Sequence, residues 1–149
     1  MRRSKRLEVV RRVADSEERR RAERLAACER RVLEALSKLN ELESYQRSYA
    51  GQFATRASGG MEAAELRDFQ SFLARLGEAV RQQGDLLARA RAERDAERGD
   101  WQHAAQRAHV VGEVVRRSRV AEQRADDKRE QGEADERAQR RPRRGHGLV

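Results

Sequence analysis

Apolar residues recur along the first third of the chain at the spacing of one helix face. From residue 5 to about residue 53 there is no proline, and the first glycine is Gly51. At 100° per residue the apolar positions fall within one narrow stripe, which predicts a single long amphipathic helix. Glu17, Glu18 and Arg21 interrupt the stripe, so we expect a weaker seam toward the N-terminus. The stripe consists of Leu7, Val10, Ala14, Leu25, Cys28, Val32, Leu36, Leu39 and Ala50.

A break follows this stripe, and a second stripe begins after it. The run from Thr55 to Gly60 combines small polar residues with two glycines and predicts a turn at about residues 54–61. The next helix is predicted over about residues 62–140, because the residue before Pro142 disfavours helix. The basic residues 141–149 are expected to form a disordered tail. The second stripe consists of Phe69, Leu73, Leu76, Val80 and Leu87.

Two long amphipathic helices joined by a short turn predict an all-α fold, an antiparallel two-helix coiled-coil hairpin that forms one domain over residues 1–149. At 1.5 Å per residue the helices measure roughly 75 Å and roughly 120 Å. Folding back at about residue 58 places Lys5 opposite a residue near 111. The second helix should therefore overhang the first from about Val115 to Arg140. A single polar helix of this kind is marginal in water and usually awaits a partner.

The composition fits a thin helical seam better than a globular core, because 40% of the residues are charged and 4% are aromatic. Disorder is the alternative, but the helical spacing of the apolar residues argues against it. The net charge is +8. Nucleic-acid binding by basic ends is therefore another alternative, although interleaved acids and the absence of a recognition motif favour no nucleic-acid partner. The basic ends comprise Arg2, Arg3, Lys5, Arg6, Arg11 and Arg12, and Arg137, Arg140, Arg141, Arg143 and Arg144.

The sequence offers no active site. It lacks a phosphate-binding glycine loop, a Cys-x-x-Cys pair and a nucleophile elbow. His103 and His109 lie on different helix faces, so we expect no metal site. Cys28 is the only cysteine, which excludes an internal disulfide, fits a reducing compartment and favours a seam residue over a nucleophile. We expect a non-enzyme without catalytic residues, cofactor or metal. No stretch resembles a secretory signal or a membrane span, which predicts the cytoplasm.

Near the turn lie residues that the two seams do not explain. On the first helix a second stripe centres about 100° away from the seam. A partly overlapping set follows on the second helix. Two interpretations stay open: a wider core where the helices splay, or a docking patch, since exposed aromatic surface marks interfaces. Trp101 is expected to pack against the first helix, with a role in an interface as the alternative. The two sets are Lys38, Leu42, Tyr45 and Tyr49, and Phe72, Leu76, Ala79 and Gln83.

These residues form an ordered series that spans nearly the whole chain. The series is Leu42-x-x-Tyr45-x-x-x-Tyr49, a glycine-containing break, Phe69-Gln70-x-Phe72-x-x-x-Leu76-x-x-Ala79-x-x-x-Gln83, Trp101, Ala121-Glu122-Gln123-Arg124 through Lys128, Glu130-Gln131 and Asp135-Glu136-x-Ala138. It resembles the FliJ family, small coiled-coil proteins of flagellar type III export. The resemblance implies a hairpin similar to the helical stalk of the rotary ATPase γ subunit.

The resemblance also implies partners: the hexameric export ATPase, entered at its central opening, the cytoplasmic domain of the export gate, and export chaperones. The residues implied for gate docking are Leu42, Tyr45, Tyr49, Phe72, Leu76 and Ala79, with Lys38 and Gln83 at positions where the family commonly has Gln and His. The residues implied for the ATPase-facing end are Glu122, Arg124, Lys128, Glu130, Gln131, Asp135 and Glu136.

The function expected from this resemblance is a non-catalytic link between the ATPase and the gate. The protein would be monomeric alone and peripheral at the cytoplasmic face of the inner membrane, held there by the export apparatus. Three alternatives stay open: the equivalent stalk protein of a virulence injectisome, a structural spacer or dimer, and a nucleic-acid-binding coiled coil.

Overall fold

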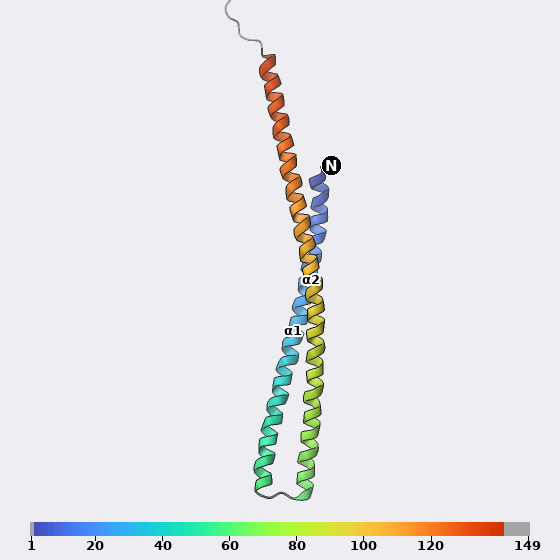
Figure 1. Ribbon diagram of the computed structural model, residues 1–149, viewed down its shortest axis with the longest axis vertical. Coiled ribbons are helices and arrows are strands. Elements are labelled where there is room, and N and C mark those ends of the chain that lie inside the picture. The colour runs from blue at the N-terminus through green and yellow to red at the C-terminus, as the bar shows by residue number, and fades with distance from the viewer. Residues whose placement is uncertain (1, 142–149) are drawn as a thin grey trace, which may run out of the picture. The chain divides into compact units, whose positions relative to one another are not determined.

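Two long helices make up nearly all of residues 2–141, the part of the chain that the computed structural model describes. Helix α1 spans Arg3–Ser58 and helix α2 spans Ala63–Arg140, and no strand occurs between residues 2 and 141. A short turn joins them (Figure 1). The predicted all-α helical hairpin is confirmed. Apart from Arg141, the predicted basic tail lies outside the described residues.

The chain divides into two compact units, each containing a segment of both helices. The turn unit is Glu18–His103, and the terminal unit is Met1–Glu17 with Ala104–Val149. Within the turn unit α1 and α2 run antiparallel from the turn (Figure 1). Within the terminal unit the start of α1 packs against the later part of α2. The single domain expected from the sequence stays a prediction.

The seam of the turn unit follows an unbroken heptad pattern. Along both helices the less exposed residues alternate at spacings of three and four, the signature of a left-handed coiled coil. Leu42 and Tyr49 belong to this series, so the prediction that they lie on a separate stripe is wrong. A straight helix drifts by about 20° per heptad against the 3.5-residue repeat, and supercoiling removes that drift. The α1 series is Leu25, Cys28, Val32, Ala35, Leu39, Leu42, Gln46, Tyr49 and Phe53, and α2 continues it with Leu66, Phe69, Leu73, Leu76, Val80, Gln83, Leu87 and Ala90.

The turn is shorter than predicted, because α1 continues to Ser58 instead of ending near residue 53. The small polar residues bond to their own helix instead of breaking it. The Thr55 hydroxyl donates to the Gly51 carbonyl at 3.0 Å, and the Ser58 hydroxyl donates to the Thr55 carbonyl at 2.8 Å. The reversal is left to residues 59–62, where Gly60 has a φ of 89°.

Replacement of Gly60 by alanine is expected to destabilise the protein by about 1 kcal/mol, because L residues rarely adopt this positive φ. Gly59 provides the matched control: a Cβ there would lie 3.6 Å from the Arg56 carbonyl oxygen, an ordinary contact, and its φ is not positive. Urea unfolding followed by circular dichroism measures both variants. Equal stability of Gly60→Ala and Gly59→Ala would contradict a strained turn.

A polar layer crosses the seam at the far end of the turn unit. The indole Nε1 of Trp101 donates to Glu18 Oε1 at 2.9 Å, and both groups are partly buried. Arg21 lies close by, with a guanidinium nitrogen 3.9 Å from Glu97 and 3.5 Å from Asp100. Glu18 and Arg21, two of the charged residues that interrupt the apolar stripe of α1, therefore meet polar partners on α2.

The terminal unit aligns the helices differently from the sequence-based expectation. Ser4 bonds to Glu122, so Lys5 does not face a residue near 111. Val115 is fully buried, at 0% exposure, and the overhang does not begin there. The later turn accounts for part of this shift, because each residue added to α1 before the reversal moves the facing residue of α2 further along. The last recorded contact between the helices joins Arg2 to Asp126. Residues 127–140, which we call the overhang, are helical and all exposed.

Candidate docking surfaces

An aromatic patch lies on the turn unit near the turn. The rings of Tyr49 and Phe72 contact each other across the two helices, with centroids 4.7 Å apart and planes tilted by 57°. Tyr45 is one helical turn before Tyr49 and is 60% exposed, while Phe72 is 37% exposed. We call Tyr45, Tyr49 and Phe72 the aromatic patch. The Tyr49 ring is held by packing against Phe72, while the Tyr45 and Phe72 rings are exposed to solvent. Such an arrangement is typical of a preorganised docking surface.

The other residues predicted to dock at the gate are distributed differently. Leu42, Leu76 and Ala79 are half-buried, and Lys38 is exposed. Gln83 is only 7% exposed, and its side-chain amide donates to the Ala35 carbonyl at 3.1 Å. Gln83 therefore joins α2 to α1 and does not lie on an exposed docking surface. The docking role of the remaining residues stays a prediction.

A second aromatic pair supports the patch from the turn side. The rings of Phe53 and Phe69 lie 5.9 Å apart, and the guanidinium of Arg56 is 5.7 Å from the Phe69 ring centroid. Arg56 also forms an ion pair of 3.0 Å with Glu65. These contacts fix the two helices to each other between the aromatic patch and the turn. The heptad spacing of both phenylalanines could have identified this pair, which the sequence-based prediction did not include.

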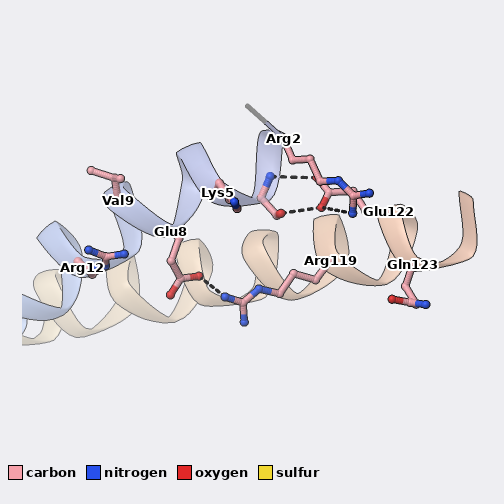
Figure 2. Close-up of a pocket in the computed structure, with 9 residues that line it drawn as sticks. Arg2, Lys5, Glu8, Val9, Arg12, Arg119, Glu122 and Gln123 are labelled. Atoms are coloured by element: carbon pink, nitrogen blue, oxygen red, sulfur yellow. Dashed lines mark hydrogen bonds and ion pairs between the residues drawn. The ribbon is translucent and has the colours of Figure 1, made fainter. Parts of the chain in front are cut away.

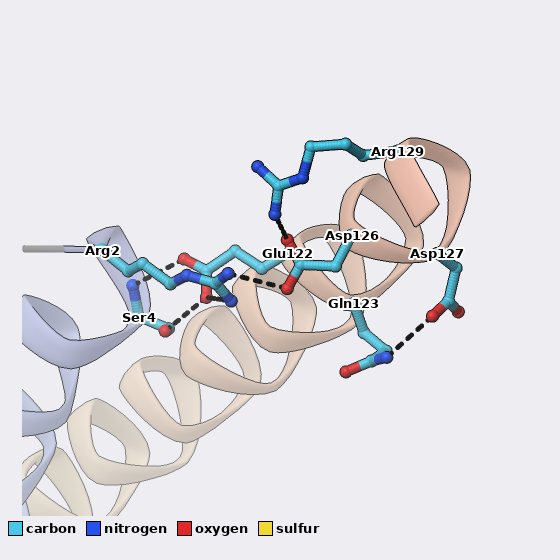
Figure 3. A network of polar contacts seen from close by, with 7 residues as sticks. All are labelled: Arg2, Ser4, Glu122, Gln123, Asp126, Asp127 and Arg129. Carbon is cyan, nitrogen blue, oxygen red and sulfur yellow. Dashed lines mark hydrogen bonds and ion pairs between the residues drawn. The ribbon is translucent and has the colours of Figure 1, made fainter. Parts of the chain in front are cut away.

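The start of α1 is held by a carboxylate that α2 supplies. The first turn of α1 contains no acidic residue, although helix N-termini favour negative charge. Glu122 fills this role: its Oε1 accepts from the Ser4 backbone N–H at 3.1 Å, and its Oε2 accepts from the Ser4 hydroxyl at 2.6 Å (Figure 3). The hydroxyl and backbone hydrogen bonds from Ser4 lower the pKa of Glu122 from its ordinary value of 4.5, and Arg2 adds to this effect.

Ion pairs extend this contact on both sides. Arg2 lies 2.7 Å from Asp126, which also accepts from Arg129 at 2.7 Å (Figure 3). One turn into α1, Glu8 and Arg119 form a pair of 2.7 Å. Polar contacts therefore join the start of α1 to α2 at several points in the terminal unit. These pairs could not be predicted from the sequence, because the register between two helices cannot be derived from the pattern of either helix alone.

Acid is expected to release the start of α1. The folded pKa of Glu122 is lowered, so its contribution is complete above the ordinary pKa and is lost as the pH falls through the folded value. The amide protection of Ser4, measured by NMR hydrogen exchange, should fall as the pH is lowered below the ordinary carboxyl pKa of 4.5. Glu122→Gln should show weaker protection that no longer depends on pH. The control Glu130→Gln should match the unmodified chain, and identical profiles for both variants would contradict the prediction.

Most residues predicted to face the ATPase project from α2 without a partner helix. Arg124, Lys128, Glu130, Gln131, Asp135 and Glu136 are exposed. Glu122 differs, because it is engaged with Ser4 at the junction of the two helices. The predicted set therefore comprises Glu122, which contacts α1, Arg124, which is exposed at the level where α1 begins, and five residues of the overhang. Their binding role stays a prediction.

A groove lies between the start of α1 and α2 in the terminal unit. Its lining includes Lys5, Val9 and Arg12 from α1, and Arg119 and Gln123 from α2 (Figure 2). Exposed valines continue the α1 side: Val9 is 53%, Val10 50% and Val13 63% exposed. The prediction that Val10 lies in the seam is therefore wrong. Val9, Val10 and Val13 do not occupy the inward positions of the heptad repeat, so they face outward.

Residues 2–141 contain no group of three or more His, Cys, Asp or Glu side chains that could hold a metal ion. Cys28 is free and 5% exposed, in the seam of the turn unit. None of the helices described has the length of apolar sequence that crossing a membrane requires.

A family model described as "Flagellar FliJ protein" matches residues 3–147, nearly the entire chain. No curated protein and no solved structure matches.

Proposed function

Because the chain belongs to the family of flagellar FliJ proteins, we propose that it links the hexameric export ATPase to the export gate as a non-catalytic stalk. Membership supports a role associated with flagellar export in general. It also favours that system over the injectisome that the sequence left as an alternative. The gate contact, the ATPase contact and the chaperone contacts are the finer parts of the proposal.

One observation carries the proposal: α2 remains helical beyond its last contact with α1. After Asp126 the overhang continues to Arg140 with every residue exposed. A charged helix without a second helix beside it is marginal by itself in water. It is well suited to enter an opening lined by polar groups, as the central channel of an ATPase ring would be. The aromatic patch in the turn unit would then dock on the cytoplasmic domain of the gate.

In this proposal the protein acts as a bridge between the ATPase and the gate. ATP hydrolysis would belong to the partner, and this chain would promote assembly or turnover of the ring through its overhang. Chaperones that deliver export cargo would be further partners. The protein would sit at the cytoplasmic face of the inner membrane through the export apparatus, without inserting into the bilayer.

The test is co-purification of the tagged full chain from its native cytoplasm, with the bound proteins identified by mass spectrometry. We expect a hexameric ATPase and the gate protein among them. Recovery of nucleic acid instead, with binding that falls steeply as salt rises, would replace the proposal with the nucleic-acid alternative. Recovery of neither class at ~150 mM salt would contradict the proposed link.

A further inference from the structure

The terminal unit separates its charges along the sequence. Residues 2–12 carry six basic side chains and one acidic side chain, whereas residues 126–136 carry six acidic and two basic side chains. We call Lys5, Val9 and Arg12 the basic face, because their spacing of four and three places them on one side of α1, where they line the groove (Figure 2). We call Asp127, Glu130 and Glu133 the acidic row of the overhang.

Both surfaces lack a charged partner within residues 2–141. Lys5 and Arg12 are exposed, and no ion pair joins either to a described residue. The acidic row is also exposed, and its one recorded contact beyond the helix backbone is a hydrogen bond from Gln123 to Asp127 at 2.9 Å. Several other charges in the unit are paired, as Arg2 with Asp126 and Glu8 with Arg119 show. The basic face and the acidic row therefore carry opposite charges that ion pairs within the unit do not neutralise.

One molecule cannot bring these surfaces together. Asp126 already lies level with Arg2 at the start of α1, and α2 continues as a helix away from that level (Figure 3). The acidic row consequently lies beyond the end of α1, while the basic face lies back along it. A second copy of the chain can supply the missing partner.

We propose that two copies of this chain associate through their terminal units, with the acidic row of each overhang against the basic face of the other. The contact is isologous, so a two-fold axis makes it twice. The lengths agree, since Lys5 to Arg12 and Asp127 to Glu133 span roughly 10 Å and roughly 9 Å. Val9, at 53% exposure, and Val10, at 50%, would be covered by the approaching helix. Ala134 lies four residues after Glu130 on the same side of the overhang, and its small side chain leaves room for that approach.

The distribution of charge in the groove favours an acidic helix over an anionic membrane as the partner of the basic face. Glu8 and Glu122 lie within the groove, and the acidic overhang extends from the same unit. A bilayer of anionic lipids would meet these acids together with the bases, whereas a single helix with three acids on one side can align those acids with Lys5 and Arg12. Exposed ion pairs are individually weak and screened by salt, so the dimer is weak and reversible. The monomer expected from the sequence then persists in dilute, saline solution.

Sedimentation velocity of the full chain tests the proposal at ~50 mM and ~500 mM salt over a concentration series. We expect a dimer with a Kd of roughly micromolar order at low salt and a monomer at high salt. Reversing the acidic row (Asp127→Lys, Glu130→Lys, Glu133→Lys) or the basic face (Lys5→Glu, Arg12→Glu) should weaken self-association at least about tenfold. Arg47→Glu with Arg75→Glu is the matched control: both residues are exposed in the turn unit, and this pair should leave the dimer intact.

The mixture of the two reversed variants gives the sharpest result. Each is expected to be monomeric alone, and together they should form a heterodimer, because each overhang then meets a face of opposite charge. A chain that stays monomeric at low salt, or reversed variants that do not pair, would overturn the proposal. So would a monomer that binds vesicles of phosphatidylglycerol through the basic face. None of these outcomes depends on the ATPase, so this experiment tests self-association independently of the proposed role in export.

Discussion

Alanine at Tyr45, Tyr49 and Phe72 together is expected to abolish binding to the cytoplasmic domain of the export gate. Central aromatic residues dominate protein interfaces, and single truncations of such anchors cost about 2 kcal/mol or more. Loss of three should therefore weaken binding by at least about a thousandfold. Isothermal titration calorimetry with the purified gate domain measures the effect, and circular dichroism reports whether the variant remains helical.

The structure shows how to separate docking from stability in this experiment. Tyr49 packs against Phe72, so its removal also weakens the helix pair, whereas Tyr45 is 60% exposed. Tyr45→Ala should reduce gate binding at least about tenfold with little change in stability. Leu33→Ala is the matched control, because Leu33 is 65% exposed on the same helix of the same unit. Gate binding by the folded triple variant at the unmodified strength would remove the docking role of the aromatic patch.

Ending the chain after Lys128 is expected to eliminate binding to the export ATPase. The truncation removes nearly all of the overhang but keeps every recorded contact of α1 with α2, the last of which joins Arg2 to Asp126. The remaining hairpin should stay folded, so lost binding would be assigned to the overhang. Co-purification with the ATPase and stimulation of its ATP hydrolysis provide two measurements.

A chain ending after Arg141 is the control for this truncation. It retains the overhang and lacks only residues 142–149, which include Arg143 and Arg144. We expect it to bind the ATPase as the full chain does. If the two truncations lose binding equally, the basic tail and not the overhang is the ATPase contact. If neither loses binding, the terminal end does not enter the ring.

The hairpin could be predicted from the sequence because its cause is local and repeated. Apolar residues at helical spacing, a glycine pair and the absence of proline before residue 142 leave few other folds. The end of α1 could not be predicted as accurately. Thr55 and Ser58 are residue types that occur often in turns, and only their hydrogen bonds to the helix backbone show that they extend α1.

The surfaces were harder to predict, because they depend on the partner helix. A projection at 100° per residue separates Tyr49 from the seam, while the supercoiled pair brings it back. Gln83 is polar and belongs to the motif that resembles the family, so the sequence suggested an exposed residue. It is buried because its side-chain amide donates to the Ala35 carbonyl on the facing helix. Likewise, Glu122 and Ser4 are far apart in sequence and meet only through the register of the terminal unit.

Trp101 provides an intrinsic spectroscopic reporter, since the chain contains a single tryptophan. Its indole N–H donates to Glu18 on the facing helix, in a partly buried setting. The wavelength of its emission therefore reads whether the two helices stay together at that level. A partner that separates them would shift the emission to the red as water reaches the indole, without any dye attached to the protein.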